Sequence, residues 1–384
     1  MSDLFSEIHS DEALRVAEFP VAGEQVYLAH AGICPLPRCV GEAMSRYLRS
    51  SQSEDQETAA GSVVGSARER VASFLSVASS EIALVGPTSD ALSVVAAGFP
   101  FVEGDNVIIY QDDYPSNVYP WLALRDRGVE LRSIRPSQLG VIEVEDVLAV
   151  ADSRTRLVAL ASCHFLAGFR PDLNEIGSAL RERAIAFCVD GIQSVGAFQA
   201  SLEYVDFMAA DSHKWMLGPS AAGFLYVRKE WHDRLRATRW GWHNLACPDF
   251  VAKDSLEYVA GARRYEAGSP NLAGLVGLEA ALGLLSRVGM ERIGADLVTK
   301  RAYLIDAIER KGYQVLGGNL PENQWGGMLA FTHPAKDLQE IFSGLAQRRV
   351  RASLRKVRDG TEYLRFAPHF YNTRSELDLA LEGL

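Results

Sequence analysis

Two short apolar runs, each followed by polar residues, constrain the fold of this 384-residue chain more than any other feature. Residues 184–189 (AIAFCV) precede Asp190, and residues 205–210 (VDFMAA) precede Asp211. Continuous apolar runs of this length are typical of strands buried on both faces in a parallel sheet. The carboxyl ends of such strands form the edge at which an α/β sheet binds ligands. The sequence therefore predicts a ligand site where these two strands end.

Strand-like and helical patterns alternate along the chain to about residue 227, with further strands expected at residues 82–85, 106–110 and 156–161. This alternation predicts an α/β fold with a large, doubly wound, mostly parallel sheet.

The pattern changes after residue 265, where two long apolar-periodic helices are followed by short strands and helices. We expect a large domain over residues 26–265 and a smaller α+β domain over residues 266–384. The N-terminal segment, residues 1–25, reads as helical and is expected to pack on the small domain.

Composition excludes several classes of protein. The net charge of −10 argues against general affinity for nucleic acid and against anionic membrane surfaces. No run has the length of a transmembrane helix, and the acidic N-terminus lacks the apolar core of a signal peptide. The five scattered cysteines indicate reduced thiols in a cytoplasmic protein, without a disulfide framework or a metal site.

Lys214 is the most informative residue after the second run. A buried lysine can have its pKa lowered and form a Schiff base with a carbonyl compound. Asp190, on the neighbouring strand, suits the pyridinium nitrogen of pyridoxal phosphate (PLP). Most lysines that follow a strand are solvated surface charges. Other residues of the site are therefore needed to favour a Schiff-base role for Lys214.

The turn at residues 86–90 (GPTSD) lies between a strand and a helix. Its backbone N–H groups, with the Thr88 hydroxyl, can hold a phosphate. Capping of the helix by Thr88 or Ser89 is the plainer interpretation, and both can hold together.

Two further loops carry aromatic and polar residues. Tyr114 stands where an aromatic ring can lie flat against a cofactor. In residues 162–173 (SCHFLAGFRPDL), three residues either approach the cofactor or build the edge: His164, Phe165 and Arg170. Arg170 is expected to form a structural ion pair with Asp172.

Taken together, the chain resembles the class V aminotransferases, the fold-type I PLP family that includes cysteine desulfurases and isopenicillin N epimerases. The resemblance covers nearly the whole chain, and its most specific motifs are DGIQSVG, DSHKWMLGPSAAGFLYVR, YEAGSPN and FYNT.

The resemblance implies a fold-type I enzyme with PLP on Lys214 and a role for each matching residue. Asp190 would hold the pyridinium, Gln193 the ring oxygen, and Tyr114 would stack on the ring. Arg365 would clamp the substrate α-carboxylate, for which a planar guanidinium is suited. The phosphate neighbourhood would comprise Thr88, Ser89, Asp211 and His213, with Ser269 reaching the phosphate of a neighbouring subunit. This last role implies a homodimer with shared active sites.

Two departures from the desulfurase pattern matter. No cysteine lies between Gln347 and Arg365, where a desulfurase carries its sulfur-accepting thiol, so activity through a persulfide is not expected. Asp211 replaces a serine, and its carboxylate would repel phosphate. Two alternatives stay open: Ser212 donates to the phosphate instead, or Asp211 orients His213.

The function expected is that of a PLP-dependent enzyme acting on the α-amino group of a small amino acid. Transamination is favoured over carbon–sulfur elimination or epimerisation. A non-catalytic PLP-binding regulator is less favoured, because the short acidic N-terminus offers no room for a DNA-binding segment. A nicotinamide or nucleotide enzyme is disfavoured because no Gly-rich phosphate motif follows a strand.

Overall fold

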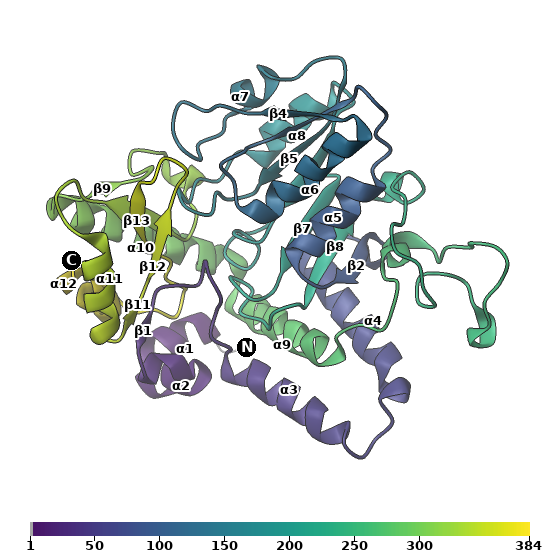
Figure 1. The fold of residues 1–384 in the computed structure, drawn as a ribbon. Coiled ribbons are helices and arrows are strands. Elements are labelled where there is room, and N and C mark those ends of the chain that lie inside the picture. Colours follow the sequence, from purple (N-terminus) through teal and green to yellow (C-terminus); the bar gives the residue numbers. More distant parts are fainter. Residues whose placement is uncertain (1–2) are drawn as a thin grey trace.

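The computed structural model describes residues 3–384 and has a large domain built on one central sheet (Figure 1). The sheet has the strand order β2-β8-β7-β6-β5-β3-β4. Strand β8 runs antiparallel to both β2 and β7, and every other neighbouring pair is parallel, which confirms the doubly wound, mostly parallel sheet predicted from the sequence. The strands are β2 (Ile82–Val85), β3 (Asn106–Ile109), β4 (Glu130–Ser133), β5 (Thr155–Ala161), β6 (Ala186–Asp190), β7 (Phe207–Asp211) and β8 (Gly223–Val227).

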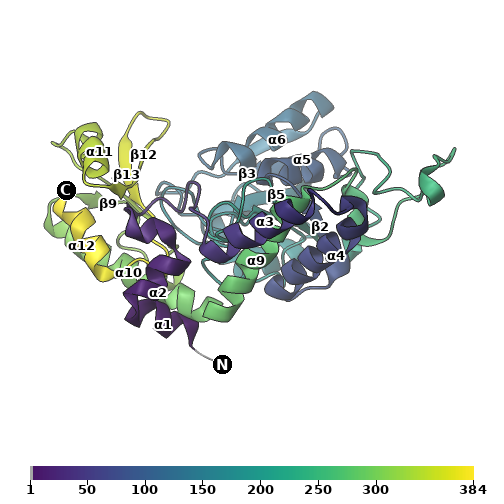
Figure 2. The ribbon, with the colours of Figure 1, turned by 90° about the horizontal axis from the view of Figure 1, so that it is seen from below.

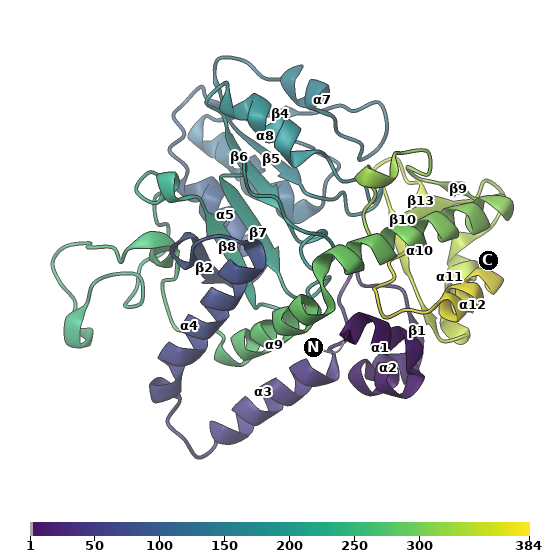
Figure 3. The same cartoon turned by 180° about the vertical axis from the view of Figure 1, so that it is seen from behind.

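Helices cover both faces of this sheet, because its central strands are apolar on both faces. Helices α5 and α6 lie on the face seen in Figure 1, and α8 lies on the opposite face, seen in Figure 3. The helices of this domain are α3 (Arg38–Ser50), α4 (Gln56–Leu75), α5 (Thr88–Gly98), α6 (Tyr119–Leu122), α7 (Val144–Leu148), α8 (Leu173–Arg181) and α9 (Leu272–Val288).

The small domain is a four-stranded antiparallel sheet of order β12-β13-β10-β9, with helices packed on it (Figure 1). Its elements are α10 (Met290–Arg310), β9 (Gln314–Val315), β10 (Leu329–Thr332), α11 (Leu338–Gln347), β11 (Val350–Arg351), β12 (Ser353–Lys356), β13 (Glu362–Phe366) and α12 (Arg374–Glu382).

The N-terminal segment folds as α1 (Leu4–Ser10) and α2 (Glu12–Glu18), which lie beside the small domain in Figure 2. Phe19 stacks on Tyr371 with ring centroids 4.1 Å apart, and buried Arg15 donates to Glu376 at 2.9 Å. The chain then forms β1 (Val26–Tyr27), which pairs with β11 of the small domain.

The two long helices after residue 265 belong to different parts of the molecule. Helix α9 packs on α3 and α4, whereas α10 packs on α12 and on strands β9 and β10. The two meet at Gly289, whose φ of 95° favours glycine. We therefore propose Gly289, instead of residue 265, as the end of the large domain.

Within residues 3–384, no single helix is long and apolar enough to cross a membrane. Helices α9 and α10 reach the required length and hydropathy only together, across a bend of 77°.

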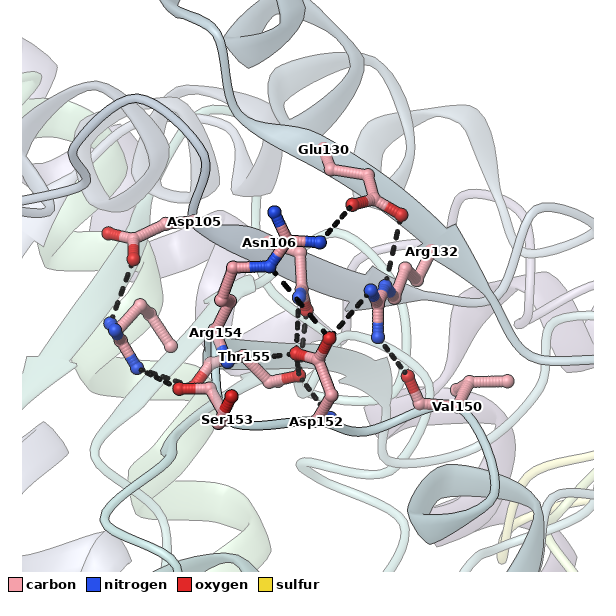
Figure 4. A network of polar contacts seen from close by, with 10 residues as sticks. Asp105, Asn106, Glu130, Arg132, Val150, Asp152, Ser153, Arg154 and Thr155 are labelled. Atoms are coloured by element: carbon pink, nitrogen blue, oxygen red, sulfur yellow. Dashed lines mark hydrogen bonds and ion pairs between the residues drawn. The ribbon is translucent and has the colours of Figure 1, made fainter.

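A polar network ties together the amino ends of β3, β4 and β5 (Figure 4). Asp152 accepts from Asn106 and from Arg132, both at 2.8 Å, and Thr155 donates to Asn106 at 2.7 Å. Because the strands are parallel, this network fixes the sheet at the edge opposite to their carboxyl ends.

A second network, buried, joins α4 to β2. Arg68 donates to Glu266 at 3.0 Å and to the backbone oxygen of Ile82 at 2.7 Å. Glu266 also accepts from the backbone N–H of Leu84 at 2.7 Å.

Glu266→Ala should destabilise the protein by about 3–5 kcal/mol, because it leaves the Arg68 guanidinium buried without its carboxylate. Denaturant titration measures the change. Glu257→Ala is the matched control: its ion pair with Lys253, at 2.9 Å, is exposed, so the loss should stay within about 0.5 kcal/mol. Equal small losses in both variants would contradict a structural role for the buried pair.

Candidate active site

A cavity of about 370 Å³ opens where β6 and β7 end, between the two domains. The large domain, the loop after β1 and the small-domain strands β12 and β13 all contribute to its wall. The lining residues are Ala31, Gly32, Ile33, Pro87, Thr88, Ser89, Tyr114, Ser116, Asp190, Ile192, Gln193, His213, Lys214, Arg355 and Arg365. The structure thus brings together all the site residues expected from the sequence except Asp211 and Ser269.

Lys214 follows β7, and its side chain is buried in the cavity wall. Its amine has no hydrogen-bond partner among residues 3–384 and lies 5.2 Å from the centroid of the Tyr114 ring. Burial lowers the lysine pKa, the Asp190 carboxylate partly offsets this, and the Arg365 charge lowers it further. The result is a desolvated amine whose neutral form is accessible at lower pH than in water.

Asp190 ends β6, only 3% exposed, and accepts a backbone hydrogen bond from Ile192 at 3.0 Å. Burial raises the pKa of its carboxyl group, and the nearby Asp113 carboxyl raises it further. Asp113, which sequence reasoning missed, is itself buried, and burial raises its pKa to about 6. A carboxyl group held in such surroundings is stabilised in its charged form by any cation that binds beside it.

Thr88 and Ser89 form the first turn of α5 and line the cavity. The Thr88 hydroxyl accepts from the backbone N–H of Asp211 at 3.0 Å, which leaves its proton free to donate. The first N–H groups of a helix have no partner within the helix. The part of the cavity lined by this turn therefore suits an anion.

Asp211 lies behind the cavity wall and holds His213. Its carboxylate contacts His213 Nδ1 at 2.7 Å and accepts backbone N–H groups from Ser212, Ala221 and Ala222. The Ser212 hydroxyl donates to the backbone oxygen of Pro219 at 2.6 Å. Of the two alternatives left open by the sequence, these contacts favour orientation of His213 by Asp211.

Gln193 is fixed by two hydrogen bonds. Its amide nitrogen donates to the backbone oxygen of Ala31 at 3.1 Å, and its amide oxygen accepts from the Trp215 indole at 2.9 Å. The first bond also ties Ala31, a cavity residue that the sequence did not mark, to Gln193.

Arg365 reaches the cavity from β13 and is 1% exposed. One of its nitrogens donates to the backbone oxygen of Phe165, but Nε and Nη2 are buried with no partner in the described structure. Burial, with the neighbouring Arg355 charge, lowers its pKa to about 9. Buried donors without partners are costly, so a bound anion would stabilise this arrangement.

The loop after β5 carries His164 and Arg170. Both ring nitrogens of His164 are taken by backbone groups, those of Asp112 and Ala167 at 3.1 Å, so it builds the edge. The expected ion pair between Arg170 and Asp172 is wrong. Arg170 instead lies over the Phe198 ring, and Asp172 caps the start of α8.

Ser269 lies away from the Lys214 cavity, in a second cavity of about 730 Å³ that it shares with Trp242 and Phe250. Both aromatic residues are exposed and belong to residues 240–258, the segment that extends farthest from the body in Figures 1 and 2.

The apoprotein should show a Lys214 pKa below the ordinary lysine value of about 10.4, because the cavity desolvates the ammonium form. Reductive methylation over a pH series, read by peptide mass mapping, measures it. Asp190→Asn should lower the midpoint further, since it removes the negative charge that favours the ammonium. Unchanged or raised midpoints in that variant would contradict the proximity of the two groups.

Known proteins are similar to this chain over nearly its whole length. The sequence model for aminotransferase class-V matches residues 26–379. A probable cysteine desulfurase of Methanothermobacter thermautotrophicus is 29% identical over 96% of each chain. An uncharacterized aminotransferase of Bacillus subtilis, YcbU, is 28% identical over 83% of this chain and 82% of its own.

Solved structures share the fold at lower identity. The apo cysteine desulfurase of Thermococcus onnurineus NA1 superimposes with a TM-score of 0.89 at 22% identity, covering 97% of this chain and 96% of its own. A C-DES variant with glycine covalently linked to its PLP cofactor has a TM-score of 0.87 at 20% identity, covering 96% of this chain and 98% of its own.

Proposed function

The chain belongs to the class-V aminotransferase family, and we propose that its Lys214 cavity processes the α-amino group of a small amino acid. The observation that carries the proposal is the buried amine of Lys214 beside the buried Asp190 carboxyl, with the unpaired Arg365 donors in the same cavity. The amine suits a carbonyl partner, and the guanidinium suits a carboxylate.

Family membership makes the chain a PLP-dependent enzyme of fold type I, an aminotransferase or a related lyase, as predicted from the sequence. PLP draws electrons from the bonds at the α-carbon of an amino acid bound to it. The residues of the cavity fit this group. Lys214 would hold it covalently, Asp190 would keep a proton on its ring nitrogen, and the first turn of α5 would hold its phosphate.

The remaining roles follow from position. His213, oriented by Asp211, would complete the phosphate end, and Gln193 would meet the ring oxygen from the wall it shares with Ala31. The Tyr114 ring would lie against the cofactor, because it already packs near the Lys214 amine.

Arg365 would bind the substrate α-carboxylate through its two unpaired nitrogens and so orient the α-carbon toward Lys214. Lys214 would become free once the substrate amino group took its place on the cofactor. Its released amine, whose neutral form is favoured by burial, would then accept the α-proton at Nζ. Lys214 and Arg365 are both buried, which limits the access of water to these two groups.

We rank transamination first, and carbon–sulfur elimination or epimerisation second. The relatives named cysteine desulfurases support a lyase as the alternative. A persulfide route is disfavoured because no cysteine is among the residues that line the cavity within the described chain. Cys34 and Cys163 are buried, which raises their pKa to about 12 and about 11 and disfavours the thiolate.

Single-turnover assays of the PLP-loaded enzyme against a panel of amino acids test the proposal. Transamination should yield one keto acid for each cofactor, without sulfide or ammonia. Asp190→Asn should slow this turnover more than tenfold, because a neutral amide does not hold the ring-nitrogen proton; a smaller loss, under about 1.4 kcal/mol, would remove that role. Rapid sulfide release from cysteine through a trapped protein persulfide would instead establish the desulfurase reaction.

We also propose a homodimer in which Ser269 serves the partner's cofactor. The support is that Ser269 is not part of the Lys214 cavity of its own subunit and lies in a cavity with the exposed aromatic residues Trp242 and Phe250. Mixed Lys214→Ala and Ser269→Ala subunits should form one intact site in each hybrid dimer and exceed both parents in activity. A fully active monomer in sedimentation would end this idea.

A further inference from the structure

Arg355 shares the face of the small-domain sheet that carries Arg365. In the antiparallel pair of β12 and β13, Ser353 lies opposite Arg365. Side chains alternate between faces along a strand, so Arg355, two residues after Ser353, points to the same side as Arg365. Both arginines line the Lys214 cavity.

Arg355 has no carboxylate partner among residues 3–384, and its one side-chain hydrogen bond goes to the backbone oxygen of Leu354. Its basic neighbours differ. Arg358 is paired with Asp112 at 2.7 Å, and Lys356 lies 3.9 Å from Glu362. Arg355 therefore stands out in this basic stretch as a cation that faces the cavity without a counter-charge.

The charges around the cavity are unequal. Lys214, Arg355 and Arg365 are basic, whereas Asp190 is the one acidic residue in the described lining. The two guanidinium groups repel, and the Arg355 charge contributes to the lowered pKa of Arg365. A ligand that brings two negative groups to these arginines would relieve this repulsion.

The proposed function accounts for only one of those negative groups. The cofactor phosphate belongs at the α5 end, near Thr88, and the α-carboxylate belongs on Arg365. Neither the phosphate nor the α-carboxylate would place a negative group beside Arg355.

We propose that Arg355 selects amino acids whose side chain carries a carboxylate. The inference rests on the proposed function and names its substrate class. Diagonal neighbours on paired strands have backbones about 7–8 Å apart, so two guanidinium groups on this face can hold the two ends of one short dicarboxylate. A guanidinium also presents donors in the planar fork that a carboxylate accepts.

The first test compares each acid with its isosteric amide: aspartate with asparagine, and glutamate with glutamine. The loaded wild-type enzyme should have a kcat/KM for one of the acids at least about tenfold higher than for its amide. A hydrogen-bonded pair of opposite charges contributes a free energy of this size. Arg355→Gln should abolish this preference while turnover of the amide persists. The matched control, Arg358→Gln, removes an arginine already paired with Asp112 and should preserve the preference.

The second test needs no turnover. Calorimetry of the loaded enzyme should show that succinate binds at least about tenfold more tightly than butyrate, and that Arg355→Gln makes the two equal. If Arg355→Gln weakened the binding of succinate and butyrate equally, both arginines would bind the same carboxylate. That result would overturn the proposal that Arg355 selects a second carboxylate.

The two proposals fail differently. If neutral amino acids react as well as acids in the wild type, Arg355 selects nothing while the proposed function stands. If no amino acid reacts but succinate still outcompetes butyrate through Arg355, the dicarboxylate site stands and the proposed chemistry falls.

Discussion

The site depends on one costly arrangement: the Lys214 amine, which has no hydrogen-bond partner in the described part of the chain, is buried beside a buried carboxyl group. Water would stabilise both charges, and the fold removes that water from Lys214 and Asp190. The parallel pairing of β6 with β7 achieves this, because it brings two strand ends to the same edge of a rigid sheet. The network at the opposite ends of β3, β4 and β5 holds that sheet (Figure 4).

The second requirement is a fixed junction between the domains, because both cavity arginines come from the small one. Arg301, buried in α10, donates to the backbone oxygens of Gly168 and Met328 and so ties the loop after β5 to the region before β10. Arg365 itself donates to Phe165 in the same loop. These contacts across the junction set the position of the guanidinium groups relative to Lys214.

Local pattern was enough to predict the sheet and the residues at its strand ends. The apolar runs located Asp190 and Lys214 because burial on both faces is visible in a few consecutive residues. Arg355 escaped prediction since its direction depends on register with a strand that follows a hairpin. The error at Arg170 has the same origin: sequence proximity favoured Asp172, whereas the fold offered the distant Phe198 ring and gave Asp172 a helix to cap.

Borohydride reduction of the PLP-loaded protein, followed by peptide mapping, tests the central claim most directly. Reduction makes a bond between a lysine amine and the cofactor aldehyde permanent. We expect the cofactor mass on the peptide containing Lys214, and we expect none on reduced Lys214→Ala protein. Label on another lysine, or none on wild-type protein that binds PLP, would contradict it.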